Sequence, residues 1–222
     1  MGAMLPLFPL GAVLYPGMLL PLHIFEERYR QLVRDLLDGP EPRRFGVIAI
    51  RQGRETGIDG VRSLYEVGCT ATLRRVDRHP DGRFDIVTVG TQRFRLSELD
   101  ETRPYLRGEV EMLADEPVDP ASAEPAVRVT QAAFREYLDA LIEWGGATVR
   151  LEELPDEPVL LSFIVAAAMI IDLPERQSLL AESGTLRRLA MQRALLSRET
   201  AMLRTTTARP APDLRNTPYN PN

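Results

Sequence analysis

Residues that commonly carry out enzyme chemistry are scarce in this chain. All 27 basic residues are arginine, so no lysine is available to contact phosphates in a P-loop, to pair with a serine or to form a Schiff base. The two histidines, His23 and His79, belong to no HExxH or zinc-binding motif, and no serine lies in a GxSxG motif. We therefore expect no catalytic residue, no cofactor and no metal site.

The proline-rich segment Met4–Pro21 is the first candidate for contact with a ligand. Proline has no amide hydrogen to donate within a sheet, so this segment is expected to be extended and irregular. Such a segment can leave apolar side chains exposed, here Tyr15, Met18 and Leu19. These side chains would suit a groove for an extended peptide or strand.

His23 follows the same segment and is a fourth candidate for contact with a peptide. It stands in an apolar stretch, where a buried neutral histidine bonded to the backbone is the commoner arrangement. The sequence leaves both interpretations open.

Four arginines surround a strong turn signal: Arg74, Arg75, Arg78 and Arg83. The turn is indicated by the run Asp77-Arg78-His79-Pro80-Asp81-Gly82. The arginines could form a patch for an acidic partner. The alternative is a solvated turn without a ligand.

Residues 4–114 are expected to form mainly strands. Residues 44–50 are a short apolar stretch rich in β-branched side chains, and residues 65–76 and 84–89 flank the turn as a hairpin. Further alternation over residues 93–96 and 105–112 indicates more short strands, which together favour a barrel or a sandwich. Within them, Phe94 is expected in the core, and Arg93 is expected to bind a carboxylate or carbonyl of a loop.

A single helix is expected to interrupt these strands. Its apolar residues recur at helical spacing before Gly39-Pro40: Phe25, Tyr29, Leu32, Val33, Leu36 and Leu37. We expect this face to pack into the core. Glu26 and Glu27 lie near the start of the helix, where they are expected to pair with Arg30 and Arg34 on its surface.

The second half of the chain has a different pattern. Residues 115–126 carry three prolines and four acids and are expected to form a linker. Residues 127–204 change to helical periodicity and are expected to form a bundle. Asp156 and Thr185 are the expected N-caps of two of its helices.

Composition argues against a membrane or a nucleic acid as the partner. The apolar helix expected over residues 159–171 is shorter than the about 20 residues that span a bilayer, so we expect a core helix. The single cysteine, Cys69, suits a reducing compartment, so we expect a cytoplasmic protein. Residues 115–204 hold 15 acids and 9 arginines, whereas nucleic-acid-binding proteins usually present a basic face. Residues 205–222 are expected to form a disordered or loosely draped tail.

Residues about 4–204 resemble the N-terminal domain of Lon proteases. The segments that carry this resemblance are Leu5-Pro6-Leu7-Phe8-Pro9-Leu10, Pro21-Leu22-His23-Ile24-Phe25-Glu26-Glu27-Arg28-Tyr29, Gly68-Cys69-Thr70-Ala71, Gly90-Thr91-Gln92-Arg93-Phe94-Arg95 and Pro104-Tyr105-Leu106. In the Lon family this domain contacts protein substrates and helps assembly, whereas separate domains hydrolyse ATP and cut peptide bonds.

The resemblance implies an α+β fold, in which a PUA-like twisted β-barrel with one inserted helix precedes a C-terminal helical bundle. It also implies a non-catalytic module for unfolded or exposed protein segments, as a monomer or a homodimer. A role as an adaptor in proteolysis is one use of such a module. The groove is expected where the two halves meet. The alternative function is RNA binding, because PUA-like folds include RNA-binding proteins.

Overall fold

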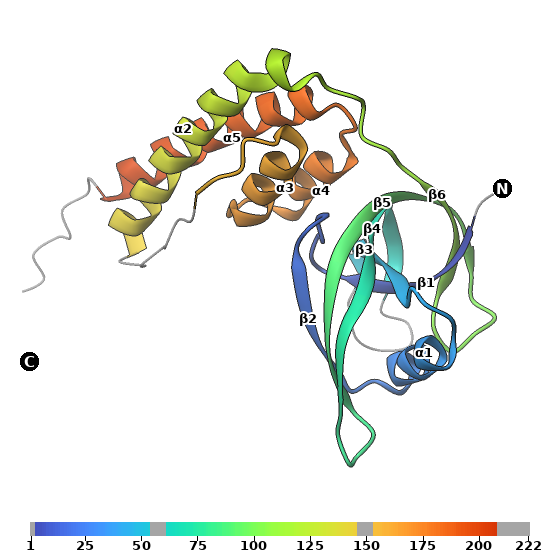
Figure 1. Cartoon of the computed structure of the whole chain (residues 1–222). Coiled ribbons are helices and arrows are strands. Elements are labelled where there is room, and N and C mark those ends of the chain that lie inside the picture. Colours follow the sequence, from blue (N-terminus) through green and yellow to red (C-terminus); the bar gives the residue numbers. More distant parts are fainter. Residues whose placement is uncertain (1–2, 54–60, 146–152, 208–222) are drawn as a thin grey trace, which may run out of the picture.

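The structure is a computed structural model that describes residues 3–53, 61–145 and 153–207. Six strands come first in these residues: β1 (Ala3–Leu10), β2 (Leu19–Ile24), β3 (Arg44–Gly53), β4 (Val61–Arg78), β5 (Phe84–Asp100) and β6 (Arg107–Met112). They form one sheet in the order β2-β5-β4-β3-β1-β6, and β6 also pairs with β5. This second pairing closes the sheet into a near-barrel (Figure 1).

β5 holds the near-barrel together because it pairs with three strands. Its first part, Phe84–Val89, lies between β2 and β4, and its second part pairs with β4 and β6. Two register shifts in the β4–β5 pairing are irregularities of the kind that bend a strand. Within the described residues β2 pairs with β5 alone, so β2 is an edge strand.

The interior of the near-barrel is filled from alternate positions of these strands. Leu7, Ile48 and Phe94 are fully buried, which confirms the expected position of Phe94. Gly68 of β4 passes directly over the Phe94 ring, where a Cβ atom would lie 2.3 Å from Cζ of the ring. The close approach of β4 to this ring therefore depends on glycine.

The inserted helix is α1 (Glu27–Asp38), and its buried residues are Tyr29, Leu32 and Val33. Tyr29 stacks on Phe8 of β1 with ring centroids 4.1 Å apart. The expectation that Phe25 belongs to this buried face is wrong, because Phe25 is 55% exposed. The helix begins only after Glu26, whose extended backbone puts Phe25 out of phase with the helical face.

The expected charge pairs on α1 are present in part. Glu27 accepts from Arg34 at 2.9 Å, as expected, and also pairs with Arg30 at 3.0 Å. Glu26 pairs instead with Arg28, at 3.0 Å. As the N-cap residue, Glu26 lies before the first turn, which favours a nearby partner over Arg30.

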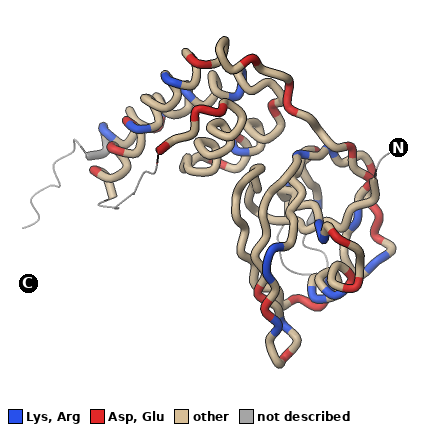
Figure 2. Tube along the Cα trace, in the orientation of Figure 1, with Lys and Arg blue, Asp and Glu red and all other residues tan. Residues whose placement is uncertain are grey.

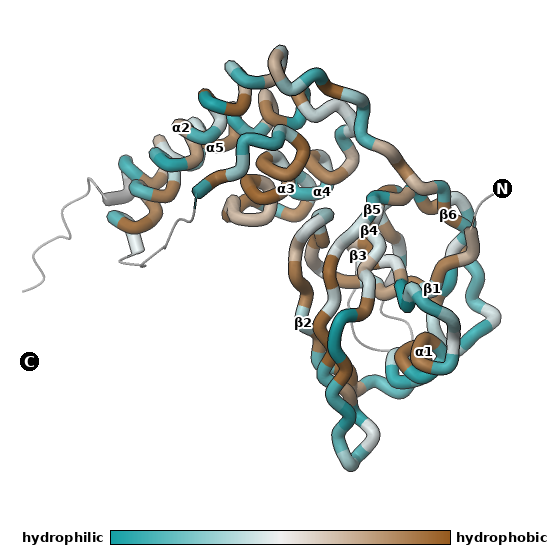
Figure 3. The backbone as a smooth tube through the Cα atoms, in the orientation of Figure 1, coloured by the Kyte–Doolittle hydropathy of each residue, from teal (hydrophilic) through white to brown (hydrophobic). Residues whose placement is uncertain are grey.

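Four helices follow the strands: α2 (Pro120–Gly145), α3 (Pro158–Ala168), α4 (Leu173–Ala181) and α5 (Thr185–Thr207). α2 and α5 lie side by side, with α3 and α4 between them and the near-barrel (Figure 1). Figure 3 shows α3 as a largely hydrophobic helix in this inner position. The expected α+β fold, a near-barrel with one inserted helix followed by helices, is confirmed.

Two expected boundaries of the helical half are wrong. The linker expected over residues 115–126 ends at Asp119, because the Asp119 carboxylate accepts from the amide of Ser122 at 3.1 Å and α2 starts with Pro120. The N-cap of α3 is Glu157 rather than Asp156. Glu157 accepts from the first free amides of α3, whereas Asp156 accepts from the Gln131 side chain of α2.

The end of the chain differs from the expectation in one respect. α5 continues to Thr207, so the first three residues of the expected tail 205–222 are helical. Residues 208–222 lie outside the described residues. No helix in the described part of the chain combines the length and apolar character needed to cross a membrane.

Buried polar contacts join the helices to the near-barrel through α4. The Gln177 amide donates to the Val67 carbonyl oxygen of β4 at 2.7 Å, and the Tyr15 hydroxyl donates to the carbonyl oxygen of Arg176 at 2.9 Å. Hydrophobic side chains of both halves also belong to one core cluster, which includes Phe163 of α3 and Leu179 of α4. The two halves therefore share part of their interior.

Candidate functional site

A groove of about 330 Å³ lies where the near-barrel meets the helices. Its lining comes from a turn before β2, from β5, from the connection to α2 and from the start of α3: Pro16, Gly17, Thr91, Gln92, Arg93, Leu113, Ala114, Asp115, Glu157, Val159, Leu160 and Phe163. We call these residues the junction groove. Most of the side chains contributed by α3 are apolar, so the groove offers a hydrophobic wall above a polar floor.

The turn that forms one rim of the junction groove is fixed by backbone hydrogen bonds. The Gly17 amide donates to the Gly90 carbonyl at 2.8 Å, and the Gly90 amide donates to the Met18 carbonyl at 2.8 Å. Gly17 has a φ of 82°, a conformation that favours glycine. A Cβ atom at Gly90 would lie 2.2 Å from the Tyr15 carbonyl oxygen. Both glycines therefore let the turn lie against β5.

The opposite rim is the first turn of α3. Glu157 accepts from the amides of Val159 and Leu160, and Pro158 occupies the first helical position, where its missing amide costs nothing. This arrangement leaves the Leu160 side chain 41% exposed. Leu160 Cδ1 lies 3.7 Å from where a Cβ of Gly17 would be, so the two rims approach each other there.

The floor of the junction groove is a buried cluster of charges. Arg93 donates to Asp115 Oδ1 at 3.0 Å, and Arg188 donates to the same oxygen at 3.1 Å. Arg93 also donates to the carbonyl oxygens of Leu180 and Ala114, which confirms its expected role. Burial lowers the pKa of Arg188, and its guanidinium lies 4.1 Å from the centre of the Phe163 ring.

Two of the four residues expected to contact a peptide lie near the groove. Leu19 is 68% exposed and Met18 is half-buried, and both follow the Gly17 turn. Tyr15 is not exposed, contrary to expectation, because its ring packs near Phe163 and its hydroxyl is bonded to α4. The segment that holds Tyr15 thus belongs partly to the core.

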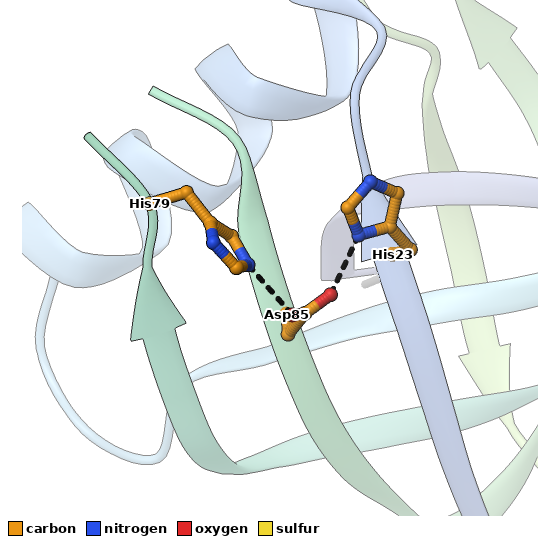
Figure 4. A group of neighbouring side chains, drawn as sticks. All are labelled: His23, His79 and Asp85. Atoms are coloured by element: carbon orange, nitrogen blue, oxygen red, sulfur yellow. Dashed lines mark hydrogen bonds and ion pairs between the residues drawn. The ribbon is translucent and has the colours of Figure 1, made fainter. Parts of the chain in front are cut away.

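His23 lies away from the junction groove, at the other end of β2. The expectation that it is buried and bonded to the backbone is wrong, because it is exposed and its Nδ1 lies 2.6 Å from Asp85 Oδ1. His79 Nε2 lies 2.6 Å from Asp85 Oδ2, so both histidines meet one carboxylate (Figure 4). Sequence analysis missed this cluster, since it depends on the pairing of β2 with β5.

The arginines of the expected acidic-partner patch lie on or beside the β4–β5 hairpin. Arg75 pairs with Asp77 at 2.8 Å, and Arg83 pairs with Asp81 at 2.6 Å. Arg78 lies over the Phe84 ring, and Arg74 is exposed. Figure 2 shows acidic and basic residues interspersed along the hairpin. This mixture of charges gives little support to a phosphate-binding surface and hence to RNA binding.

A second recess, of about 630 Å³, lies between α1, β4 and the segment before β6. Its lining includes both acids and arginines, for example Glu27, Arg62, Glu101 and Arg103.

The start of α3 is the part of the junction groove that sequence analysis did not assign to a site. Val159, Leu160 and Phe163 belong to an apolar run, which indicated a core helix. Phe163 is indeed buried, whereas Leu160 lies on the exposed side. The preceding proline and acid mark the helix start, but they do not reveal that this end faces a turn 140 residues earlier in the chain.

The fold and the groove define an α+β module, with a near-barrel capped by helices and one apolar groove at their junction. The chain belongs to the family of the substrate-binding domain of ATP-dependent protease La (LON), whose sequence model matches residues 4–198. This finding confirms the resemblance to the Lon N-terminal domain.

Curated relatives include Lon protease of Anaeromyxobacter dehalogenans (strain 2CP-C), which is 27% identical over 91% of this chain and 24% of its own length. Lon protease of Escherichia coli (strain K12) is 26% identical over 90% of this chain and 25% of its own length. The chain thus spans about a quarter of the length of these relatives.

Two solved structures have the same fold. A Lon N-terminal domain protein from Xanthomonas campestris is 26% identical, with a TM-score of 0.61 over 88% of this chain and 98% of the other. The N-terminal domain of a Mycobacterium avium complex Lon protease is 16% identical, with a TM-score of 0.62 over the same shares.

Proposed function

We propose that this chain binds extended or unfolded protein segments in the junction groove and has no catalytic activity of its own. The observation that carries the proposal is the apolar wall of α3, where Leu160 stays 41% exposed beside a rigid turn. A solvent-exposed leucine in a preformed groove is a favourable contact for an apolar side chain of a ligand.

The edge strand β2 supports the same proposal. It begins at Leu19, two residues after the Gly17 turn on the rim of the groove. An edge strand has free backbone groups that an extended segment can pair with, while pockets beside the edge select side chains. Pro21 interrupts the donors of this edge, so we expect a peptide to pair near Leu19 rather than along all of β2.

Family membership supports a protein ligand, since the matching family is described as a substrate-binding domain. We infer that the chain acts as an adaptor that presents unfolded segments for proteolysis by a separate enzyme. The sequence carries none of the lysine chemistry of ATP hydrolysis or of a Ser-Lys protease, which fits a non-catalytic role.

The test is a titration of a fluorescently labelled, permanently unfolded model protein with the chain. We expect saturable binding, and Leu160→Glu should weaken it at least about tenfold, because a carboxylate would be desolvated against the apolar wall. Val129→Glu is the matched control, since Val129 is an exposed apolar residue on α2, outside the groove lining. Binding that is absent, or that both variants weaken equally, would contradict the proposal.

A further inference from the structure

The only two histidines of the sequence converge on one carboxylate. His23 Nδ1 and His79 Nε2 each lie 2.6 Å from a different oxygen of Asp85 (Figure 4). The ligand atoms of the three side chains all lie within 4.8 Å of one another. Their side chains are 46%, 37% and 49% exposed, so a small solute can reach them.

The sheet holds these three residues in place. His23 and Asp85 are direct partners in the β2–β5 pairing, so their side chains project from the same face. His79 follows the last residue of β4, and its amide donates to the Arg83 carbonyl at 2.9 Å to close the hairpin. Three neighbouring segments therefore each supply one side chain from a fixed backbone position.

We propose that His23, His79 and Asp85 form a binding site for a divalent transition-metal ion, of which Zn²⁺ is the representative. A tetrahedral zinc site with bonds of about 2.0–2.2 Å holds its ligand atoms roughly 3.3–3.6 Å apart. Half-exposed side chains reach that spacing by small rotations. Two imidazoles and one carboxylate suit zinc and its neighbours better than Ca²⁺ or Mg²⁺, which prefer oxygen ligands.

Carboxylates near this position favour a cation, whereas one neighbouring arginine opposes it. Asp77 is the partner of Asp85 across the β4–β5 hairpin, so it adds a second carboxylate to the same face, and it shares its charge with Arg75 at 2.8 Å. The two carboxylate oxygens of Asp85 face the two imidazoles, one each, so the charge of this ligand is directed toward the position of the ion.

Arg83 is the opposing group. Its Nη1 lies 3.3 Å from His23 Nε2, which must then be the acceptor, so the proton of a neutral His23 is on Nδ1. A metal bound at Nδ1 would shift that proton to Nε2, and two donors would face each other. Arg83 would have to withdraw toward Asp81, with which it already pairs at 2.6 Å. Arg83 thus weakens the site, and its removal should strengthen it.

Isothermal titration of Zn²⁺ into the untagged chain tests the proposal. We expect one ion per chain, with the affinity reduced at least about tenfold in the His23→Ala/His79→Ala variant, which contains no imidazole. Arg83→Gln should bind about tenfold more tightly, the effect of removing one unit charge roughly 5 Å from a divalent ion in water-like surroundings. Cys69 is buried and does not compete for the ion.

Two further measurements distinguish the loss of a metal ligand from the loss of the fold. Circular dichroism of each variant checks that the fold is intact, and Asp85→Asn provides a second variant that lacks one ligand but keeps both histidines. Co²⁺ should give visible absorption bands of a nitrogen- and oxygen-ligated ion in the wild type, and these bands should be absent in the histidine variant. Equal affinity of Zn²⁺ for the wild type and the histidine variant would overturn the proposal.

Discussion

Arg93 of β5 and Asp115 of the connection to α2 form a buried ion pair, with Nη2 of the arginine 3.0 Å from Oδ1 of the aspartate. Asp115 also accepts from Arg188 of α5, at 3.1 Å. One carboxylate therefore bridges two guanidinium groups, one from the near-barrel and one from the helices. Both arginines are almost fully buried, at 1% and 0% exposure of their side chains, so each depends on this partner.

Asp115→Ala should destabilise the whole chain. The substitution leaves two buried arginines without this counter-charge. We expect a loss of about 2–4 kcal/mol in the free energy of unfolding. This loss is at the lower end for buried ion pairs because Asp115 is partly exposed. Urea unfolding at neutral pH measures this loss. The exposed Glu111→Ala is the control and should change stability by less than about 0.5 kcal/mol. An equally small effect of Asp115→Ala would contradict the role given to the pair.

Tyr105 and Asp35 should make stability depend on pH. The Tyr105 hydroxyl donates to the Asp35 carboxylate at 2.6 Å, and this hydrogen bond is the main cause of the lowered pKa of Asp35. A lowered carboxyl pKa contributes stability that is present above the unfolded pKa, about 3.9, and is lost as the pH falls through the folded pKa. The free energy of unfolding should therefore fall as the pH drops below about 4.

The variant Tyr105→Phe isolates this contribution. It should cost about 1–2 kcal/mol at pH 7, and the difference from the wild type should be smaller at pH 3, which lies below the ordinary carboxyl pKa of about 3.9. Tyr137→Phe is the control, because the Tyr137 hydroxyl accepts from the Ile170 amide and that amide does not titrate. Its cost should be similar at both pH values. A constant cost of Tyr105→Phe across this range would show that Asp35 is not its relevant partner.

A comparison of two glycines tests the packing of the near-barrel. In Gly68→Ala the new methyl group would lie 2.3 Å from Phe94 Cζ and 2.6 Å from the Val47 carbonyl oxygen, so the core must shift. We expect a loss of about 1–3 kcal/mol. In Gly145→Ala the methyl group would meet nothing within 4 Å, and the change should stay within about 0.5 kcal/mol. Thermal unfolding of both variants provides the measurement, and equal losses would contradict the packing.

Features fixed by neighbouring residues could be predicted from the sequence. The β4–β5 hairpin follows from a turn that contains Pro80, Asp81 and Gly82, and α5 begins within one residue of the expected start. Thr185 is not its N-cap, however, because Thr185 is the first helical residue and its buried hydroxyl has no hydrogen-bond partner among the described residues. Arg93 was also expected to bind a carboxylate or carbonyl, because a charged residue beside a core phenylalanine on a strand requires such a partner.

Features that depend on distant pairing could not be predicted in the same way. The contact of Gln177 with the Val67 carbonyl joins residues 110 positions apart, and neither residue carries a local signal for it. The burial of Phe25 and of Tyr15 could not be predicted from the local sequence either. Phe25 fits a helical pattern but is exposed, because α1 starts only after Glu26. Tyr15 stands in an irregular segment but is buried, because α4 lies against it.

The position of β1 within the sheet has a consequence for the order of events during synthesis. Of the six described strands β1 is made first, yet its residue Ala3 pairs with Val110 of β6, the last of the six. A ribosome must therefore deliver the whole near-barrel before β1 finds its second neighbour. Until then one edge of the apolar strand β1 is unpaired, so the incomplete near-barrel is open to association through this edge.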